Sequence, residues 1–197
     1  MITHTTTQLL AELRSSSGET AWVDFDARYR PVLQRFATQL GFASSDADEL
    51  AQQTLTEFCR AFREGLYDPA RGRLRSWLIG IARNVGHAMR RNRGAARVGG
   101  NSVLDTLPDE AALTHIWDEQ REKEVFDQAM RTLRASSRMD QVTIQAFELY
   151  AIRGIDVDEV AKRCDMSVDT VYVIKNRLTK RLREIVAELT AAYEEGE

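Results

Sequence analysis

Most of this 197-residue chain repeats one pattern, in which apolar side chains recur three and four positions apart. That spacing is the period of an amphipathic α-helix with one buried face. The clearest stripe runs from Phe25 to Leu40, and Gly41 is suited to end it. Further stripes cover residues 8–14, 47–62, 74–92, 116–133 and 142–152. Because only three prolines and eleven glycines interrupt the chain, the sequence predicts an all-α fold.

The helical pattern weakens in the middle of the chain, from Gly94 to about Leu113. This stretch contains a Gly-Gly-Asn-Ser run and Pro108, and it lacks a sustained period. We therefore expect two helical domains on a flexible tether. The expected parts are an N-terminal extension (1–20), a first domain (21–95), a linker (96–122), a second domain (123–190) and an acidic tail (191–197).

The composition favours a cytoplasmic protein. No apolar stretch approaches the roughly 18–20 residues that a membrane-spanning helix needs, and the N-terminus lacks the features of a secretion signal. Cys59 and Cys164 lie far apart and are expected to be reduced core thiols. The histidines His4, His87 and His115 lack metal-ligand spacing. The sequence thus predicts neither a metal site nor a cofactor.

Positive charge is concentrated in two places, although the formal net charge is -3. Residues 69–104 contain eight arginines and no Asp or Glu, and a second basic run covers 175–183. Two separated cationic surfaces on an acidic protein indicate a polyanion that is contacted twice. Each run taken alone is also compatible with an ordinary solvated face.

The second basic run lies in a pattern typical of a helix-turn-helix. A short helix starts near Asp156, a turn covers 164–166, and Ser167 is placed to N-cap a longer helix. Such a unit presents the polar face of its second helix to the major groove of DNA. An ordinary antiparallel helix pair would show a similar pattern. The candidate DNA contacts on that face are Thr170, Tyr172, Val173, Asn176, Arg177 and Lys180.

Residues 46–53 lie at the start of a predicted helix and contain several acidic residues and two glutamines. A metal-binding carboxylate cluster is disfavoured because no His or further acid recurs at helical spacing and no nucleophile accompanies the acids. The side chains of Ser44, Ser45 and Asp46 are instead expected to cap the helix. The exposed face is suited to docking a basic protein surface, although a simple solvated face is also compatible with the pattern.

The arginine-rich helix that follows combines cationic, aromatic and amide side chains between Leu74 and Asn84. Such a mixture suits unstacked single-stranded bases. Trp77 lies at core spacing and is expected to pack inside. Gly80 and Gly86 are unusual within a helix, where they either loosen it or permit a close approach of the backbone.

In this order the pieces resemble the sigma-70 family of bacterial transcription initiation factors, in particular its small two-domain extracytoplasmic-function group (group 4). Residues 46–62 (DADELAQQTLTEFCRAF) are similar to the core-binding region 2.2. Residues 75–91 (RSWLIGIARNVGHAMRR) are similar to regions 2.3 and 2.4, which melt and read the −10 element. Residues 141–185 are similar to region 4, which reads the −35 element.

The resemblance implies a non-catalytic specificity subunit with no small-molecule substrate and no membrane insertion. Its partners would be core RNA polymerase, bound at the clamp helices of the largest subunit, and promoter DNA. An anti-sigma protein is common in this group, although no feature of the sequence identifies one. The linker would pass near the active-site cleft of the polymerase.

The resemblance also assigns site residues. Those implied to bind core polymerase are Asp46, Asp48, Glu49, Leu50, Gln52 and Gln53. Those implied to bind the −10 element are Arg73, Arg75, Arg83, Asn84, His87, Arg90 and Arg91. The −35 residues are the six helix-turn-helix candidates given above. The loop from Tyr67 to Arg75 would capture a flipped base of the non-template strand.

Two other interpretations stay open. A stand-alone helix-turn-helix regulator would bind duplex DNA tightly without a polymerase. A metal-dependent nuclease would use the acids of residues 46–49 and would cleave DNA when magnesium is supplied.

Overall fold

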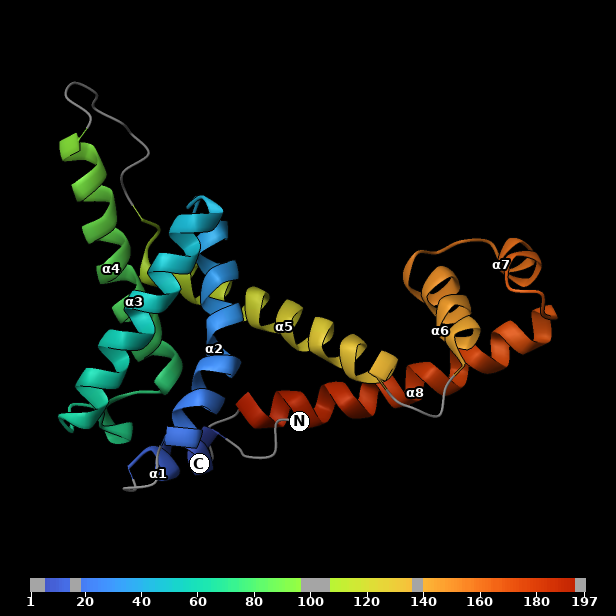
Figure 1. The fold of residues 1–197 in the computed structure, drawn as a ribbon, viewed down its shortest axis with the longest axis horizontal. Helices are drawn as coiled ribbons and strands as arrows, with labels where there is room; N and C mark the ends of the chain where they lie inside the picture. The colour runs from blue at the N-terminus through green and yellow to red at the C-terminus, as the bar shows by residue number, and fades with distance from the viewer. Residues whose placement is uncertain (1–5, 15–18, 97–106, 136–139, 194–197) are drawn as a thin grey trace. The chain divides into compact units, whose positions relative to one another are not determined.

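The computed structural model describes residues 6–14, 19–96, 107–135 and 140–193. Within those ranges every regular element is a helix and no strand occurs (Figure 1), which confirms the predicted all-α fold. The elements are α1 (Thr6–Leu13), α2 (Glu19–Gln39), α3 (Ser44–Arg63), η1 (Pro69–Arg71), α4 (Leu74–Ala96), α5 (Glu110–Ala135), α6 (Gln141–Phe147), η3 (Glu148–Ile152), α7 (Val157–Arg163) and α8 (Val168–Tyr193).

The chain divides into two units. The first contains Met1–Glu124 and Tyr193–Glu197, and the second contains Val125–Ala192. Parts of the predicted extension, linker and tail, at residues 1–5, 15–18, 97–106 and 194–197, lie outside the described residues. None of the helices in the described ranges combines the length and the apolar character that crossing a bilayer requires.

The core of the first unit forms where α3 packs against both α2 and α4. Apolar stripes from the three helices meet there, as their spacing predicts; the fully buried members include Val32, Leu33, Phe36, Leu50, Phe58 and Leu78. Full burial of one such side chain contributes about 1.5–3 kcal/mol. The short helix α1 adds Leu9, Leu10 and Leu13 to this core, and the Thr6 and Tyr29 hydroxyls lie 3.0 Å apart.

A cluster of aromatic rings extends this core toward the loop before α4. Phe25 and Phe58 stack with ring centroids 4.4 Å apart, and Trp22 meets both rings edge-on. Tyr67 stacks on Trp77 at 5.0 Å. Such pairs stabilise a fold beyond their buried area, so the cluster fixes the loop between α3 and α4 relative to both helices.

The first half of α5 corrects the predicted linker. The sequence placed a linker over residues 96–122, whereas α5 begins at Glu110. Its buried side chains, Leu113, Trp117, Gln120 and Glu124, follow helical spacing. Two of these four are polar, which hides the apolar period in the sequence. Trp117 meets the ring of Phe36 edge-on at 5.7 Å, so this half of α5 packs within the first unit.

Gly86 permits a close approach within the first unit, one of the two roles that the sequence suggested for it. A Cβ atom at this position would lie 3.4 Å from the side chains of both Leu107 and Phe42. An alanine would touch both side chains, and a residue with a longer side chain would push against them.

The second unit consists of the rest of α5, α6, η3, α7 and α8. Its core draws on each element and includes Leu133, Ile144, Phe147, Val160, Val171, Ile174 and Leu178. The π-helical turn η3 extends α6, and Gly154 follows it at φ 68°. On this turn Tyr150 is half-buried and Ala151 is exposed.

Candidate polymerase and nucleic-acid interfaces

The N-terminal part of α3 presents an acidic face to solvent. Asp48, Glu49, Gln52 and Gln53 are all exposed. The amide of Gln34 donates to Asp48 at 2.8 Å, and that of Gln53 donates to Glu49 at 2.9 Å. Because these donors are neutral, they leave the two negative charges available to a basic partner.

The other two predicted docking residues of α3 lie inside. Leu50 is fully buried in the core, and Asp46 is 6% exposed. The capping prediction for this helix was wrong, because Ser44 is already helical and Ala43 is the N-cap, with no side-chain hydrogen bond. Asp46 instead lies in the first turn, where the positive end of the helix dipole stabilises a carboxylate.

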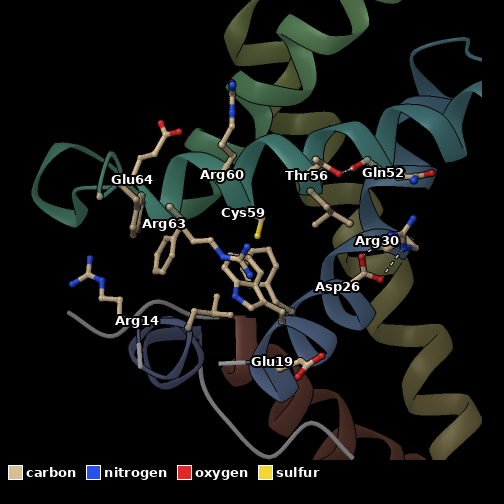
Figure 2. A pocket seen from close by; sticks show the side chains of 17 residues that line it. Arg14, Glu19, Asp26, Arg30, Gln52, Thr56, Cys59, Arg60, Arg63 and Glu64 are labelled. Carbon is tan, nitrogen blue, oxygen red and sulfur yellow. Dashed lines mark hydrogen bonds and ion pairs between the residues drawn. The ribbon is translucent and has the colours of Figure 1, made fainter. Parts of the chain in front are cut away.

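A cavity of about 1370 Å³ opens beside this face, between α1, α2 and α3 (Figure 2). Gln52, Thr56 and Cys59 line it from α3, at the spacing of one helix face. Trp22 and Phe25 line it from α2, and the Arg63 guanidinium of α3 lies 5.4 Å from the Trp22 ring. A recess of this kind can accept an apolar side chain of a docked protein.

Two details of this cavity were not foreseen from the sequence. Cys59, expected in the core, is half-buried and lines the cavity. Arg30 and Asp26 form an ion pair at 2.6 Å on its α2 side (Figure 2). The hydrogen bonds that Arg30 donates to the Asp26 carboxylate raise the pKa of Arg30, which therefore stays charged. The dense aromatic pattern of residues 22–67 was the available signal for this recess.

The acidic face of α3, with Asp48, Glu49, Gln52 and Gln53, is called the α3 ridge below. A second groove, of about 690 Å³, lies on the other side of this ridge. Gln52, Gln53 and Thr56 line it from α3, and Trp77 and Asn84 line it from α4. The exposed ridge of α3 thus has a cavity on one side and a groove on the other. This shape can provide the shape complementarity of a specific protein interface.

The predicted −10 residues fall into two groups on and before α4. The exposed ones are Arg73, Arg83, Asn84 and Arg91, and His87 is half-buried. Arg75 and Arg90 are engaged within the fold. Arg75 donates from Nη1 to both carboxylate oxygens of Asp118 at 2.9 Å. Arg90 donates to the Leu40 carbonyl at 2.7 Å and lies 5.0 Å from the Phe42 ring.

The loop predicted to capture a base encloses a recess of about 370 Å³. Leu66, Tyr67, Asp68, Gly72, Arg73, Ser76 and Trp77 line it. The Asp68 carboxylate accepts from the backbone N–H of Ala70 at 2.9 Å and so orders η1. Gly72 adopts φ 156° and ψ 163°, a conformation that is essentially restricted to glycine. The loop is therefore shaped by its own residues as well as by the aromatic cluster.

Trp77 packs as predicted, edge-on against Phe58 at 5.2 Å and stacked on Tyr67. It is nonetheless half-buried, and it lines both the loop recess and the groove beside α3. One side of its ring can pack in the core while the other side contacts a bound group.

In the second unit, α7, the turn after it and α8 follow the helix, turn and helix of the predicted pattern. The Asp156 carboxylate caps α7 by accepting from the backbone N–H of Asp158 at 3.0 Å. Asp165 takes a left-handed φ of 49° in the turn. Ser167 Oγ accepts from the backbone N–H of Thr170 at 3.1 Å, which confirms the predicted N-cap of α8. Cys164 is buried, as expected for a core thiol.

All six predicted −35 residues of α8 are exposed: Thr170, Tyr172, Val173, Asn176, Arg177 and Lys180. The opposite face of the helix is buried through Val171, Ile174 and Leu178. Val173 is 63% exposed, which is unusual for a large apolar side chain and suits contact with a thymine methyl group.

Tyr150 joins this surface, although no local pattern in the sequence indicated it. Its ring meets that of Tyr172 edge-on at 5.7 Å. The hydrogen bond between the two hydroxyls raises the pKa of Tyr172. The protonated phenol of Tyr172 can donate to a phosphate or a base.

Residues 25–95 match the family model described as Sigma-70 region 2. The match covers most of α2, all of α3 and η1, and nearly all of α4, so it includes both the acidic face and the arginine-rich helix. No curated protein matches the chain. The match supports a sigma-70 type role in transcription initiation, which agrees with the resemblance seen in the sequence.

Proposed function

We propose that this chain is a sigma factor of the sigma-70 family, of the two-domain extracytoplasmic-function type. It binds core RNA polymerase in the cytoplasm and directs the enzyme to promoters with particular −10 and −35 elements. The observation that carries the proposal is the Sigma-70 region 2 match, which spans the acidic and arginine-rich helices. The chain itself performs no catalysis, since phosphodiester synthesis belongs to the polymerase.

The acidic ridge of α3 docks on the clamp helices of the largest polymerase subunit. Asp48 and Glu49 supply the charge that attracts a basic surface, and Gln52 and Gln53 supply hydrogen bonds. The two hollows beside the ridge accept apolar side chains of the partner. Leu50 and Asp46 act from inside, by holding the ridge in place.

The arginine-rich side of α4 and the loop before it hold the melted −10 strand. Arg73, Arg83 and Arg91 neutralise phosphates, and Asn84 and His87 bind nearby. A flipped base enters the recess beside Trp77. Flipping costs a few kcal/mol, and stacking on an aromatic ring returns about 1–3 kcal/mol per base. Stacking alone therefore nearly offsets the cost, and hydrogen bonds in the loop supply the rest.

The exposed face of α8 enters the major groove at the −35 element. Thr170, Tyr172 and Val173 lie in the first turns and meet base edges. Arg177 and Lys180 follow further along the helix and neutralise phosphates.

The proposal is tested by binding measurements with and without core polymerase. We expect the purified chain to co-elute with core enzyme in gel filtration and to bind promoter duplex weakly by itself. Addition of core enzyme should then strengthen promoter binding by orders of magnitude. Tight operator binding by the chain alone, with no core association, would instead identify a stand-alone helix-turn-helix regulator.

A further inference from the structure

One predicted DNA contact, Arg75, is held by an acid of the same chain. Arg75 lies in the first turn of α4, and its Nη1 is 2.9 Å from both carboxylate oxygens of Asp118 in α5. The two side chains are 33% and 31% exposed, so water screens the pair only in part. Both residues belong to the first unit.

Asp118 is positioned by a packed helix. Trp117, its neighbour, is 2% exposed and meets Phe36 edge-on at 5.7 Å. About two turns further on, the buried Glu124 pairs with Arg35 at 3.1 Å. Because these contacts fix the backbone of α5, the Asp118 carboxylate pays little conformational entropy to meet Arg75.

A carboxylate on Arg75 resembles a nucleic-acid phosphate. Both groups accept charge-assisted hydrogen bonds from a guanidinium, and both do so in similar geometry. Because Nη1 of Arg75 is bonded to both Asp118 oxygens, a DNA phosphate that takes this position must displace Asp118. The apparent affinity for DNA is the intrinsic affinity multiplied by the fraction of molecules in which Arg75 is released from Asp118.

We propose that Asp118 is an internal competitor that occupies the phosphate-binding position of Arg75 and weakens nucleic-acid binding by the free chain. The inference rests on the proposed function, because the role of Arg75 in DNA binding comes from it. A purely structural ion pair would instead tie α5 to α4, and Arg75 would never contact DNA.

Binding of a fluorescein-labelled single-stranded DNA of mixed sequence to the full chain, at low salt, separates these cases. Asp118→Asn keeps the side-chain shape and removes the charge, and it should bind about three- to tenfold more tightly than wild type. Asp118→Glu restores the charge and should restore weak binding. Glu119→Gln is the matched control, since Glu119 lies on the same helix and pairs with His115, at 3.9 Å, rather than with an arginine of α4.

Arg75→Ala, made alone and with Asp118→Asn, gives a second readout. Competition predicts that the gain from Asp118→Asn disappears when Arg75 is absent, so Arg75→Ala and the double variant bind alike. Thermal unfolding of the same samples shows that each variant is folded. The inference is overturned if Asp118→Asn fails to tighten binding, if Glu119→Gln tightens it equally, or if the gain persists without Arg75.

The failure of this inference is distinguishable from failure of the proposed function. If core polymerase binds the chain and Asp118→Asn leaves DNA affinity unchanged, only the competition is wrong. If the chain never binds core polymerase and Asp118→Asn still tightens DNA binding through Arg75, the competition stands in a nucleic-acid-binding protein of another kind.

Discussion

The two basic helices, α4 and α8, both carry predicted DNA contacts but present them differently. In α8 every predicted contact is exposed, because a single apolar face packs against its own unit. In α4 the predicted contacts are divided: Arg83 and Arg91 face solvent, whereas Arg75 and Arg90 bond within the fold. A helix packed on one side keeps its polar face for a ligand. A helix packed on several sides shares its arginines between structure and binding.

The largest expected effect concerns the acidic ridge of α3, which is the proposed contact with core polymerase. Asp48→Lys with Glu49→Lys reverses two exposed charges at the proposed polymerase contact, and like-charge contacts cost several kcal/mol. We expect core polymerase binding to fall by more than about a hundredfold, measured by gel filtration and titration. The thermal unfolding midpoint should change little, because both side chains are exposed.

A double variant on α5, Glu119→Lys with Glu122→Lys, makes the same charge change at two other exposed positions of the first unit. It should bind core polymerase as wild type does. Equal loss in both double variants would show that net charge, and not the α3 ridge, controls the association.

The next effect tests whether α8 contributes phosphate contacts. Arg177→Ala should weaken promoter duplex binding by polymerase holoenzyme about five- to tenfold and lower the salt dependence by about one counterion. Arg181→Ala is the control, since Arg181 already pairs with Glu184 at 3.1 Å. Affinity measured over a range of salt concentrations checks both the loss of affinity and the change in salt dependence. An unchanged salt dependence in Arg177→Ala would contradict a phosphate role.

Two neighbouring arginines of α4, Arg90 and Arg91, test which side chains of this helix stabilise the fold and which bind DNA. Arg90→Ala removes a hydrogen bond to Leu40 and a contact with the Phe42 ring. It should lower the free energy of unfolding by about 1–2 kcal/mol, as read from urea denaturation. Arg91→Ala should leave stability unchanged and weaken binding of single-stranded −10 DNA. If Arg90→Ala instead affects only DNA binding, the two groups on α4 are wrongly assigned.

The smallest effect concerns the tyrosine pair beside α8. Tyr150→Phe removes the hydrogen bond that raises the pKa of Tyr172, so that pKa should fall toward its ordinary value of about 10. A raised phenol pKa favours the protonated form; the contribution of the pair to stability is therefore complete at neutral pH and is lost only in alkali. NMR titration of labelled tyrosines measures the change, and an unaltered Tyr172 pKa would show that the hydroxyls do not interact.

The sequence predicted what depends on local pattern. The stripes of α2, α3 and α8 and the N-cap at Ser167 follow from neighbouring residues, and the structure agrees. The helical stripe predicted from residue 116 starts later than α5, which begins at Glu110, because the buried Gln120 and Glu124 leave few apolar residues to mark the period of this helix.

Long-range pairing was also invisible in the sequence. Arg75 and Asp118 are 43 positions apart, and no local rule joins them. Asp46 looked like a surface acid because its neighbours Asp48 and Glu49 are exposed, yet helix geometry turns it inward. Patterns thus identify which helices carry charge, and only packing shows which of those charges are available to a partner.

The central claim is that this chain gives core RNA polymerase a new promoter specificity. Run-off transcription from fragments of genomic DNA, with purified core polymerase and with or without the chain, measures that directly. We predict discrete transcripts that appear only when the chain is added and that disappear with Asp48→Lys and Glu49→Lys. An identical set of transcripts with and without the chain, from preparations in which a known initiation factor works, would contradict the account.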